Sequence, residues 1–169
     1  MKRKKSLISS SKGNVSIEVV IIVVVLLAFS FAAIYVYGVF NSVMDDLRED
    51  EDISDASLAP TEQLESQYPS IFDTAFLIIF IVLWLAAIIS AFQIDTYPIF
   101  FGISVFALIV ILCVPPILGN TFEEAMNDET TDYSESFPIM FYVMQHILQL
   151  SIFVGASVLV ALYAKSRLG

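Results

Sequence analysis

The sequence has little of what enzymes and disulfide-bonded domains depend on. Its 169 residues include one cysteine, one histidine and six glycines. A single cysteine excludes an intrachain disulfide. There is no phosphate-binding glycine loop, no Ser/His/Asp set and no Cys/His metal spacing. The sequence therefore predicts no catalytic, cofactor-binding or metal-binding residue, and we expect a protein that is not an enzyme.

Charge is absent from four long stretches of the chain. Residues 19–40, 74–94, 96–122 and 136–164 contain no Asp, Glu, Lys or Arg, and the whole sequence is 57% hydrophobic. Each stretch exceeds the roughly 20 residues that a helix needs to cross about 30 Å of hydrocarbon. The sequence predicts an all-α, multi-pass integral membrane protein with four transmembrane helices, embedded in a lipid bilayer.

The charged residues are segregated along the chain. Seven of the eight basic residues precede the first apolar stretch or follow the last: Lys2, Arg3, Lys4, Lys5, Lys12, Lys165 and Arg167. Sixteen of the eighteen acidic residues lie between positions 45 and 73 or between 123 and 135. By the positive-inside rule, both termini face the inner side and the acidic segments face outward. The basic ends suit anionic lipid or nucleic acid as partners, although setting the topology is a sufficient role for them.

These patterns divide the chain into six parts. Val43, Met44 and Leu47 keep a helical spacing beyond the first apolar stretch, so the first helix should extend past the membrane on the acidic side. The expected parts are a basic tail (1–18), the first transmembrane helix with its extension (19–47) and an acidic outer loop (48–73). A transmembrane hairpin (74–122), a second acidic outer loop (123–135) and the fourth helix with a short basic tail (136–169) follow.

Local signals predict where the second and third helices begin and end. Ser70 and Asp73 have capping-box spacing, which predicts that the second helix begins there. Pro115 and Pro116 remove backbone donors late in the third apolar stretch. We expect them to end or kink the third helix.

The N-terminus carries a motif of its own. Gly13 follows the basic segment "KRKKSLISSSK" and precedes Asn14, Val-Ser-Ile, Glu18 and an apolar run. This arrangement resembles the class III signal peptide of type IV pilins and archaellins. The resemblance implies cleavage after Gly13, Asn14 as the new N-terminus, and Glu18 as the carboxylate that neutralises a neighbouring subunit's terminal amine. Alternatively, Glu18 only interacts with the positive end of the helix dipole.

Strongly polar side chains deep in the apolar stretches are confined to the fourth: Gln145, His146 and Gln149. Gln145 and Gln149 are four residues apart and so share a helix face. We expect these three residues to make interhelical hydrogen bonds, to helices of the same chain or of another membrane protein. An alternative is that His146 is a proton-relay group in a small channel or transporter.

A second resemblance involves residues 70 to 150. The segments "SIFDTAFLIIF", "IDTYPIFFGIS", "ILGNTFEEAM" and "FPIMFYVMQHI" resemble small polytopic membrane proteins of membrane-containing bacterial and archaeal viruses. That resemblance implies a structural protein of a virion membrane or cell-surface complex in contact with a capsid. The prepilin-like motif implies instead an appendage or secretion component in a prokaryotic cytoplasmic membrane, with appendage proteins as its partners.

Overall fold

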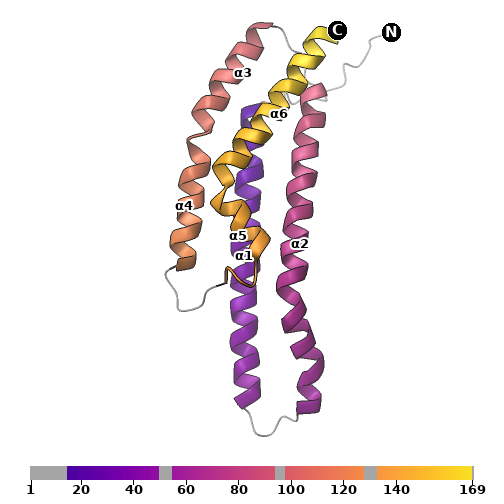
Figure 1. Ribbon diagram of the computed structural model, residues 1–169, viewed down its shortest axis with the longest axis vertical. Coiled ribbons are helices and arrows are strands. Elements are labelled where there is room, and N and C mark those ends of the chain that lie inside the picture. Colours follow the sequence, from indigo (N-terminus) through magenta and orange to yellow (C-terminus); the bar gives the residue numbers. More distant parts are fainter. Residues whose placement is uncertain (1–14, 50–54, 94–97, 128–132, 169) are drawn as a thin grey trace, which may run out of the picture.

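Two long antiparallel helices run through the molecule. The computed structural model describes residues 15–49, 55–93, 98–127 and 133–168. The long pair is α1 (Val15–Glu49) and α2 (Asp55–Gln93). Four shorter helices pack beside the upper part of this pair in Figure 1: α3 (Pro98–Ile111), α4 (Val114–Asn127), α5 (Pro138–Gln145) and α6 (Ile147–Leu168). No strand occurs in the described residues.

Four helical segments are long and apolar enough to cross a membrane. They are Ile17–Glu49, Leu58–Phe92, Val105–Glu124 and Ile147–Lys165. The predicted all-α fold with four membrane-spanning helices is therefore confirmed. The extension of the first helix is confirmed as well, because α1 continues to Glu49.

The third transmembrane segment is interrupted ahead of its two prolines. α3 ends at Ile111 and α4 begins at Val114, which directly precedes Pro115 and Pro116. Neither proline can donate a backbone hydrogen bond to the preceding turn. The Cys113 backbone N–H instead bonds Val110 O at 3.3 Å, a tighter turn than that of an α-helix. The predicted kink is confirmed.

The fourth transmembrane segment is also interrupted, although it has no proline at that point. α5 ends at Gln145 and α6 begins at Ile147, with His146 between them. The His146 backbone N–H and its imidazole Nδ1 both approach Tyr142 O, at 3.1 and 2.9 Å. The break therefore falls where a side chain and the backbone share one carbonyl.

The second helix begins much earlier than its sequence predicts. α2 starts at Asp55 and continues through Pro60 and Pro69, so residues 55–73 are helical and the predicted outer loop 48–73 is wrong over that part. The Ser70–Asp73 capping box is also wrong, because both residues lie inside the helix. Packing against α1 compensates for the backbone hydrogen bonds that the two prolines remove.

The second predicted outer loop is shorter than expected. α4 continues to Asn127, so residues 123–127 of the predicted loop 123–135 are helical. Residues 128–132 lie outside the described residues.

The core lies where α1, α2, α5 and α6 meet, and α4 closes one side of it. Leu26 of α1, Phe76 of α2, Phe122 of α4, Met144 of α5 and Val158 of α6 are completely buried. Large apolar side chains also cover the outer faces of the helices, where they suit contact with lipid: Ile78, Val82, Ile103, Phe106, Ile109 and Val160. Because lipid is as apolar as these residues, close packing and interhelical hydrogen bonds must hold the bundle together.

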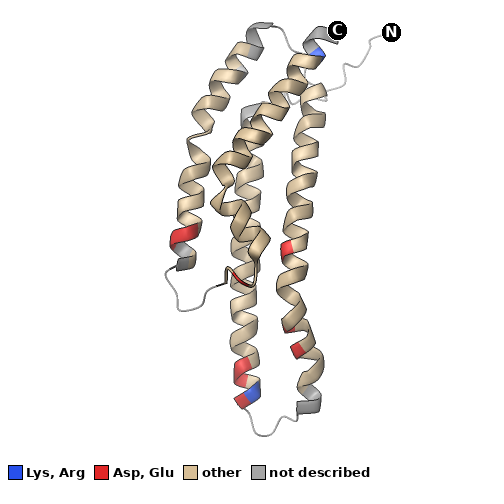
Figure 2. Cartoon of the chain, viewed as in Figure 1, with Lys and Arg blue, Asp and Glu red and all other residues tan. Residues whose placement is uncertain are grey.

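Figure 2 shows that the described charges are separated along the bundle. The acidic residues gather toward the end where α1 finishes and α2 begins, whereas α6, which carries Lys165 in its last turn, finishes at the opposite end. Glu18, in the first turn of α1, is the exception. The start of α1 and the end of α6 lie at the same end of the molecule (Figure 1). That both termini face the inner side stays a prediction.

Candidate functional site

Residues 39–49 of α1 and 55–68 of α2 form a helical hairpin that we call the outer hairpin, because the charge pattern of the sequence predicts that it faces outward. Between Glu18 and Gly38, α1 rises about 30 Å at about 1.5 Å per residue, which is the thickness of the hydrocarbon layer. Both helices continue past the lower ends of α4 and α5 (Figure 1). A hydrocarbon layer of that thickness beginning at Glu18 would end at the base of the outer hairpin, which continues two of the helices that are long and apolar enough to cross a membrane.

Arg48 joins the two helices near the tip of the outer hairpin. Its guanidinium contacts Glu65 Oε2 at 2.6 Å, Asp45 Oδ1 at 3.2 Å and Glu62 Oε1 at 3.6 Å. Asp45 lies on α1, whereas Glu62 and Glu65 lie on α2. One cation thus holds three carboxylates from two helices, an arrangement suited to the planar fork of arginine donors.

Aromatic rings stiffen the base of the outer hairpin. The ring of Tyr68 stacks on Phe72, with centroids 4.1 Å apart, and on Tyr37 and Phe40 across the helix pair at 5.5 and 6.4 Å. Tyr68 also donates a hydrogen bond of 3.3 Å to Ala33 O. Stacked aromatic pairs contribute about 0.5–1.5 kcal/mol beyond the area they bury. The outer hairpin is therefore anchored to the bundle by side chains as well as by helix continuity.

Asp73 caps a helix other than its own. Its carboxylate oxygens accept hydrogen bonds from the backbone N–H groups of Ile139 at 2.8 Å and Met140 at 2.7 Å, in the first turn of α5. The N-cap of α5, Phe137, has no side-chain oxygen, and Pro138 follows it. Asp73 thereby satisfies two donors that a helix N-terminus leaves unpaired.

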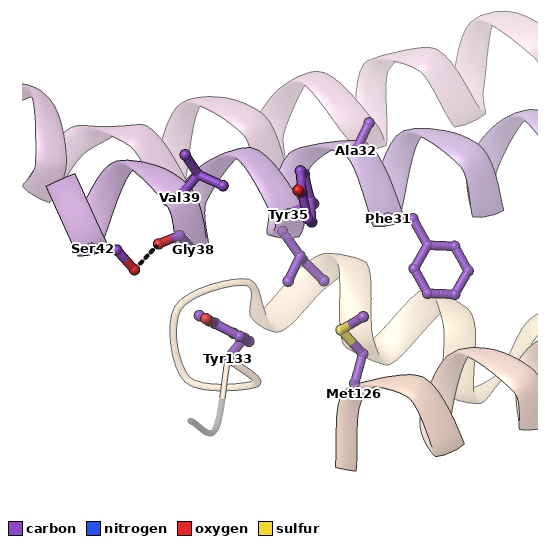
Figure 3. Close-up of a pocket in the computed structure, with 9 residues that line it drawn as sticks. Phe31, Ala32, Tyr35, Gly38, Val39, Ser42, Met126 and Tyr133 are labelled. Carbon is purple, nitrogen blue, oxygen red and sulfur yellow. Dashed lines mark hydrogen bonds between the residues drawn. The ribbon is translucent and has the colours of Figure 1, made fainter. Parts of the chain in front are cut away.

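A groove opens beside the base of the outer hairpin. Figure 3 shows it between α1 on one side and α4 with the segment preceding α5 on the other. Its volume is about 730 Å³. The groove is lined by Phe31, Ala32, Ile34, Tyr35, Gly38, Val39, Ser42, Met126 and Tyr133. Since no lining side chain is charged, the groove is suited to an apolar group.

Gly38 allows the Tyr133 hydroxyl to approach α1 at one end of the groove. A Cβ atom at this position would lie 3.0 Å from Tyr133 Oη. The hydroxyl of Ser42, one turn further along α1, donates a hydrogen bond of 3.0 Å to Gly38 O. The polar groups at this end of the groove are a tyrosine hydroxyl and a serine hydroxyl that is already bonded to its own helix.

The predicted assembly residue Glu18 contacts its own chain. Ser90 Oγ of α2 donates a hydrogen bond to Glu18 Oε1, and Glu18 Oε2 is buried without a partner in the described part of the chain. The carboxyl lines a cavity of about 210 Å³ whose other walls are apolar apart from Ser90. Gly13 and Asn14, the predicted processing residues, lie outside the described residues.

The three polar residues of the fourth transmembrane segment do not meet another helix through hydrogen bonds. Gln145 and Gln149 are exposed. Neither makes a hydrogen bond to any residue in the described ranges. The His146 imidazole contacts Tyr142 O of its own helix and stacks on the Tyr142 ring, with centroids 4.3 Å apart. These residues therefore make no interhelical hydrogen bond within the described chain.

Sequence reasoning missed the contacts that define the site. Arg48 was noticeable only as the single basic residue among the acids, and Asp73 was assigned to a local cap. Trp84 Nε1 also donates a hydrogen bond of 2.9 Å to Ser157 Oγ, joining α2 to α6. The contacts of Asp73 and Trp84 join helices that are far apart in the sequence. The contacts of Arg48 with Glu62 and Glu65 form because residues 55–73, predicted as a loop, are helical.

Comparison of the chain with protein-family models, curated proteins and solved structures found no match. The functional proposals below therefore depend on the geometry of the chain itself.

Proposed function

We propose that the chain is a non-enzymatic structural component of a larger membrane assembly, in a virion membrane or a cell-surface complex. The observation that supports this role is the outer hairpin, which continues two membrane-spanning helices and is cross-braced by Arg48. A braced helical pair of this kind holds a surface at a fixed distance from the bilayer. Such a surface suits contact with a capsid or another protein layer.

The charge of the outer hairpin defines the partner that it would accept. Its charged residues are six acids and one base: Asp45, Asp46, Glu49, Asp55, Glu62, Glu65 and Arg48. Arg48 is already engaged by three of the carboxylates. A protein surface rich in Lys and Arg would complement the remaining charge and would be attracted from a distance.

Affinity purification of the tagged chain from its native membrane tests this role. We expect a capsid or surface-layer protein to co-purify in a stoichiometric amount. Reversing two exposed charges, Asp46→Lys with Glu49→Lys, should abolish co-purification without disturbing the Arg48 contacts. A matched control is Glu124→Lys, which reverses an exposed charge on α4. Recovery of the wild-type chain only as free protomers would contradict the proposal.

The basic ends of the chain have a separate expected partner. Lys165 is in the last turn of α6, and α6 finishes at the end of the bundle opposite the outer hairpin (Figure 1). We propose that this end contacts anionic lipid headgroups or nucleic acid, since each Lys or Arg near an anionic surface contributes about 1 kcal/mol. Binding to vesicles with and without anionic lipid, at low and high salt, distinguishes this role from topology alone.

A second candidate function is that of a prepilin-peptidase substrate acting as an appendage or secretion component. The observation that favours it is Glu18 Oε2, a buried carboxylate oxygen without a hydrogen-bond partner in the described residues, because a cationic group beside it would offset the cost of its burial. The intact mass of the purified protein tests this candidate, because cleavage after Gly13 removes the first thirteen residues. A mass equal to that of the full chain would exclude it.

A further inference from the structure

A row of exposed residues on α6 follows the exposed glutamine at the end of α5. Gln149, Ile152, Ala156 and Val160 are all exposed and are spaced three or four residues apart, so they form one stripe along the helix. Gln145, at the end of α5, is also exposed. We call these five residues the α6 stripe.

Gln149 lies within the hydrocarbon layer. Ser157 is at the level of Trp84 because the two side chains are hydrogen-bonded. Ser90 is hydrogen-bonded to Glu18, at which the hydrocarbon layer begins on the predicted inner side. Ser90 is about 9 Å from Trp84 along α2, and Gln149 is about 12 Å from Ser157 along α6, in the direction away from Ser90. Gln149 is thus about 21 Å from the inner limit of a layer about 30 Å thick. A primary amide at this depth is costly unless another group bonds to it.

We propose that the α6 stripe is the surface through which two copies of this chain associate in the membrane. A glutamine amide carries both donors and acceptors, so the same amide on a second copy complements it. The charge asymmetry of the chain inserts every copy in the same orientation. A twofold axis along the membrane normal then brings Gln149 to the depth of its counterpart, as an isologous interface requires.

The apolar part of the stripe fits the same partner. Residues 149 to 160 make three steps in 11 residues, a spacing close to the 3.6 residues per turn of a straight α-helix, so the stripe keeps to one face along α6. Ala156 is small enough to let the two backbones approach. The interface deepens the proposed structural role, but it requires no protein other than this chain.

Disulfide crosslinking tests the geometry of the interface. In a Cys113→Ser background, which removes the exposed native thiol, single cysteines are introduced as Ile152→Cys or Ala156→Cys. The matched control is Ile78→Cys, equally lipid-facing at 56% exposure but on α2. Oxidation in bilayers should give covalent dimers from the two α6 variants and not from the control. Equal crosslinking at all three positions, or none on α6, would overturn the proposal.

The contribution of the amides is measured by energy transfer between labelled copies in bilayers. The double variant Gln145→Leu/Gln149→Leu should raise the dimer dissociation constant by about tenfold, because two average interhelical hydrogen bonds are lost. Ile78→Leu should leave it unchanged. A monomeric wild-type chain in bilayers, even one that crosslinks to a different protein in native membranes, would overturn self-association. Loss of capsid binding with the dimer intact would contradict only the proposed function.

Discussion

Asp73 of α2 and Met140 of α5 are 67 positions apart in the chain, yet a carboxylate oxygen of Asp73 lies 2.7 Å from the Met140 backbone nitrogen. The same carboxylate accepts a hydrogen bond from Ile139 N–H. One buried side chain therefore performs the capping that α5 lacks in its own sequence. The contact also fixes the height of α5 against α2 at the level where the outer hairpin leaves the bundle.

Removal of this cap should destabilise the fold measurably. Asp73→Ala leaves two N–H groups of α5 without their acceptor, and we expect the free energy of unfolding to fall by about 2–4 kcal/mol. Asp73→Asn should cost less, because one carbonyl oxygen remains. Unfolding in mild detergent, followed by circular dichroism, measures both. The neighbouring exposed Thr74→Ala is the control. Equal stability of Asp73→Ala and Thr74→Ala would show that the cap is unimportant.

The hydrogen bond between Trp84 and Ser157 should have a measurable but modest energy. A double-mutant cycle with Trp84→Phe and Ser157→Ala removes the donor and the acceptor separately. We expect a coupling free energy of about 0.6 kcal/mol, the average for such bonds in membrane proteins, and no more than about 1.7 kcal/mol. A coupling of zero would mean that the 2.9 Å contact makes no net contribution to stability.

Arg48→Met should loosen the outer hairpin while leaving the membrane bundle intact. The variant keeps much of the side-chain length but loses all three contacts to carboxylates. Hydrogen exchange should become faster in residues 42–49 and 58–66 and stay unchanged in the membrane-spanning parts. Asp46→Asn, which changes an exposed acid outside this cluster, serves as the control. Faster exchange throughout α1 would indicate instead that Arg48 supports the whole fold.

Gly38→Ala should have opposite effects in two backgrounds. In the wild type the new Cβ would lie 3.0 Å from Tyr133 Oη, so the tyrosine must shift and the free energy of unfolding should fall slightly. In Tyr133→Phe that hydroxyl is absent. The better helix propensity of alanine, worth up to about 1 kcal/mol, should then stabilise α1. The same detergent unfolding measurement checks both variants, and an identical sign in both would contradict the assigned contact.

The four spans of this fold and the break in its third segment were predictable because they depend on local properties. Uncharged stretches long enough to cross a bilayer predict four helices, whatever their partners. Pro115 and Pro116 predict an interruption because they lack backbone donors. The extension of α1 followed from Val43, Met44 and Leu47, whose helical spacing continues beyond the apolar stretch.

The start of α2 could not be predicted in the same way. Pro60, Pro69 and a run of polar residues favour a loop, but α1 provides a surface against which Tyr68 and Glu65 pack. The role of Asp73 depends on the position of α5, which the local sequence does not contain. The positions of Gln145 and Gln149 were predicted to share a polar role, but only the bundle reveals that both are exposed.

The continuity of α1 and α2 through the membrane surface has a mechanical consequence. α1 is one helix without a proline from its transmembrane part to the tip of the outer hairpin, so the hairpin must follow the tilt of the bundle. Helices tilt to match bilayer thickness. The 35 residues of α1 form a lever about 52 Å long, and a tilt of about 10° would move its tip sideways by about 9 Å. Lipid composition would thereby set the lateral reach of the acidic tip.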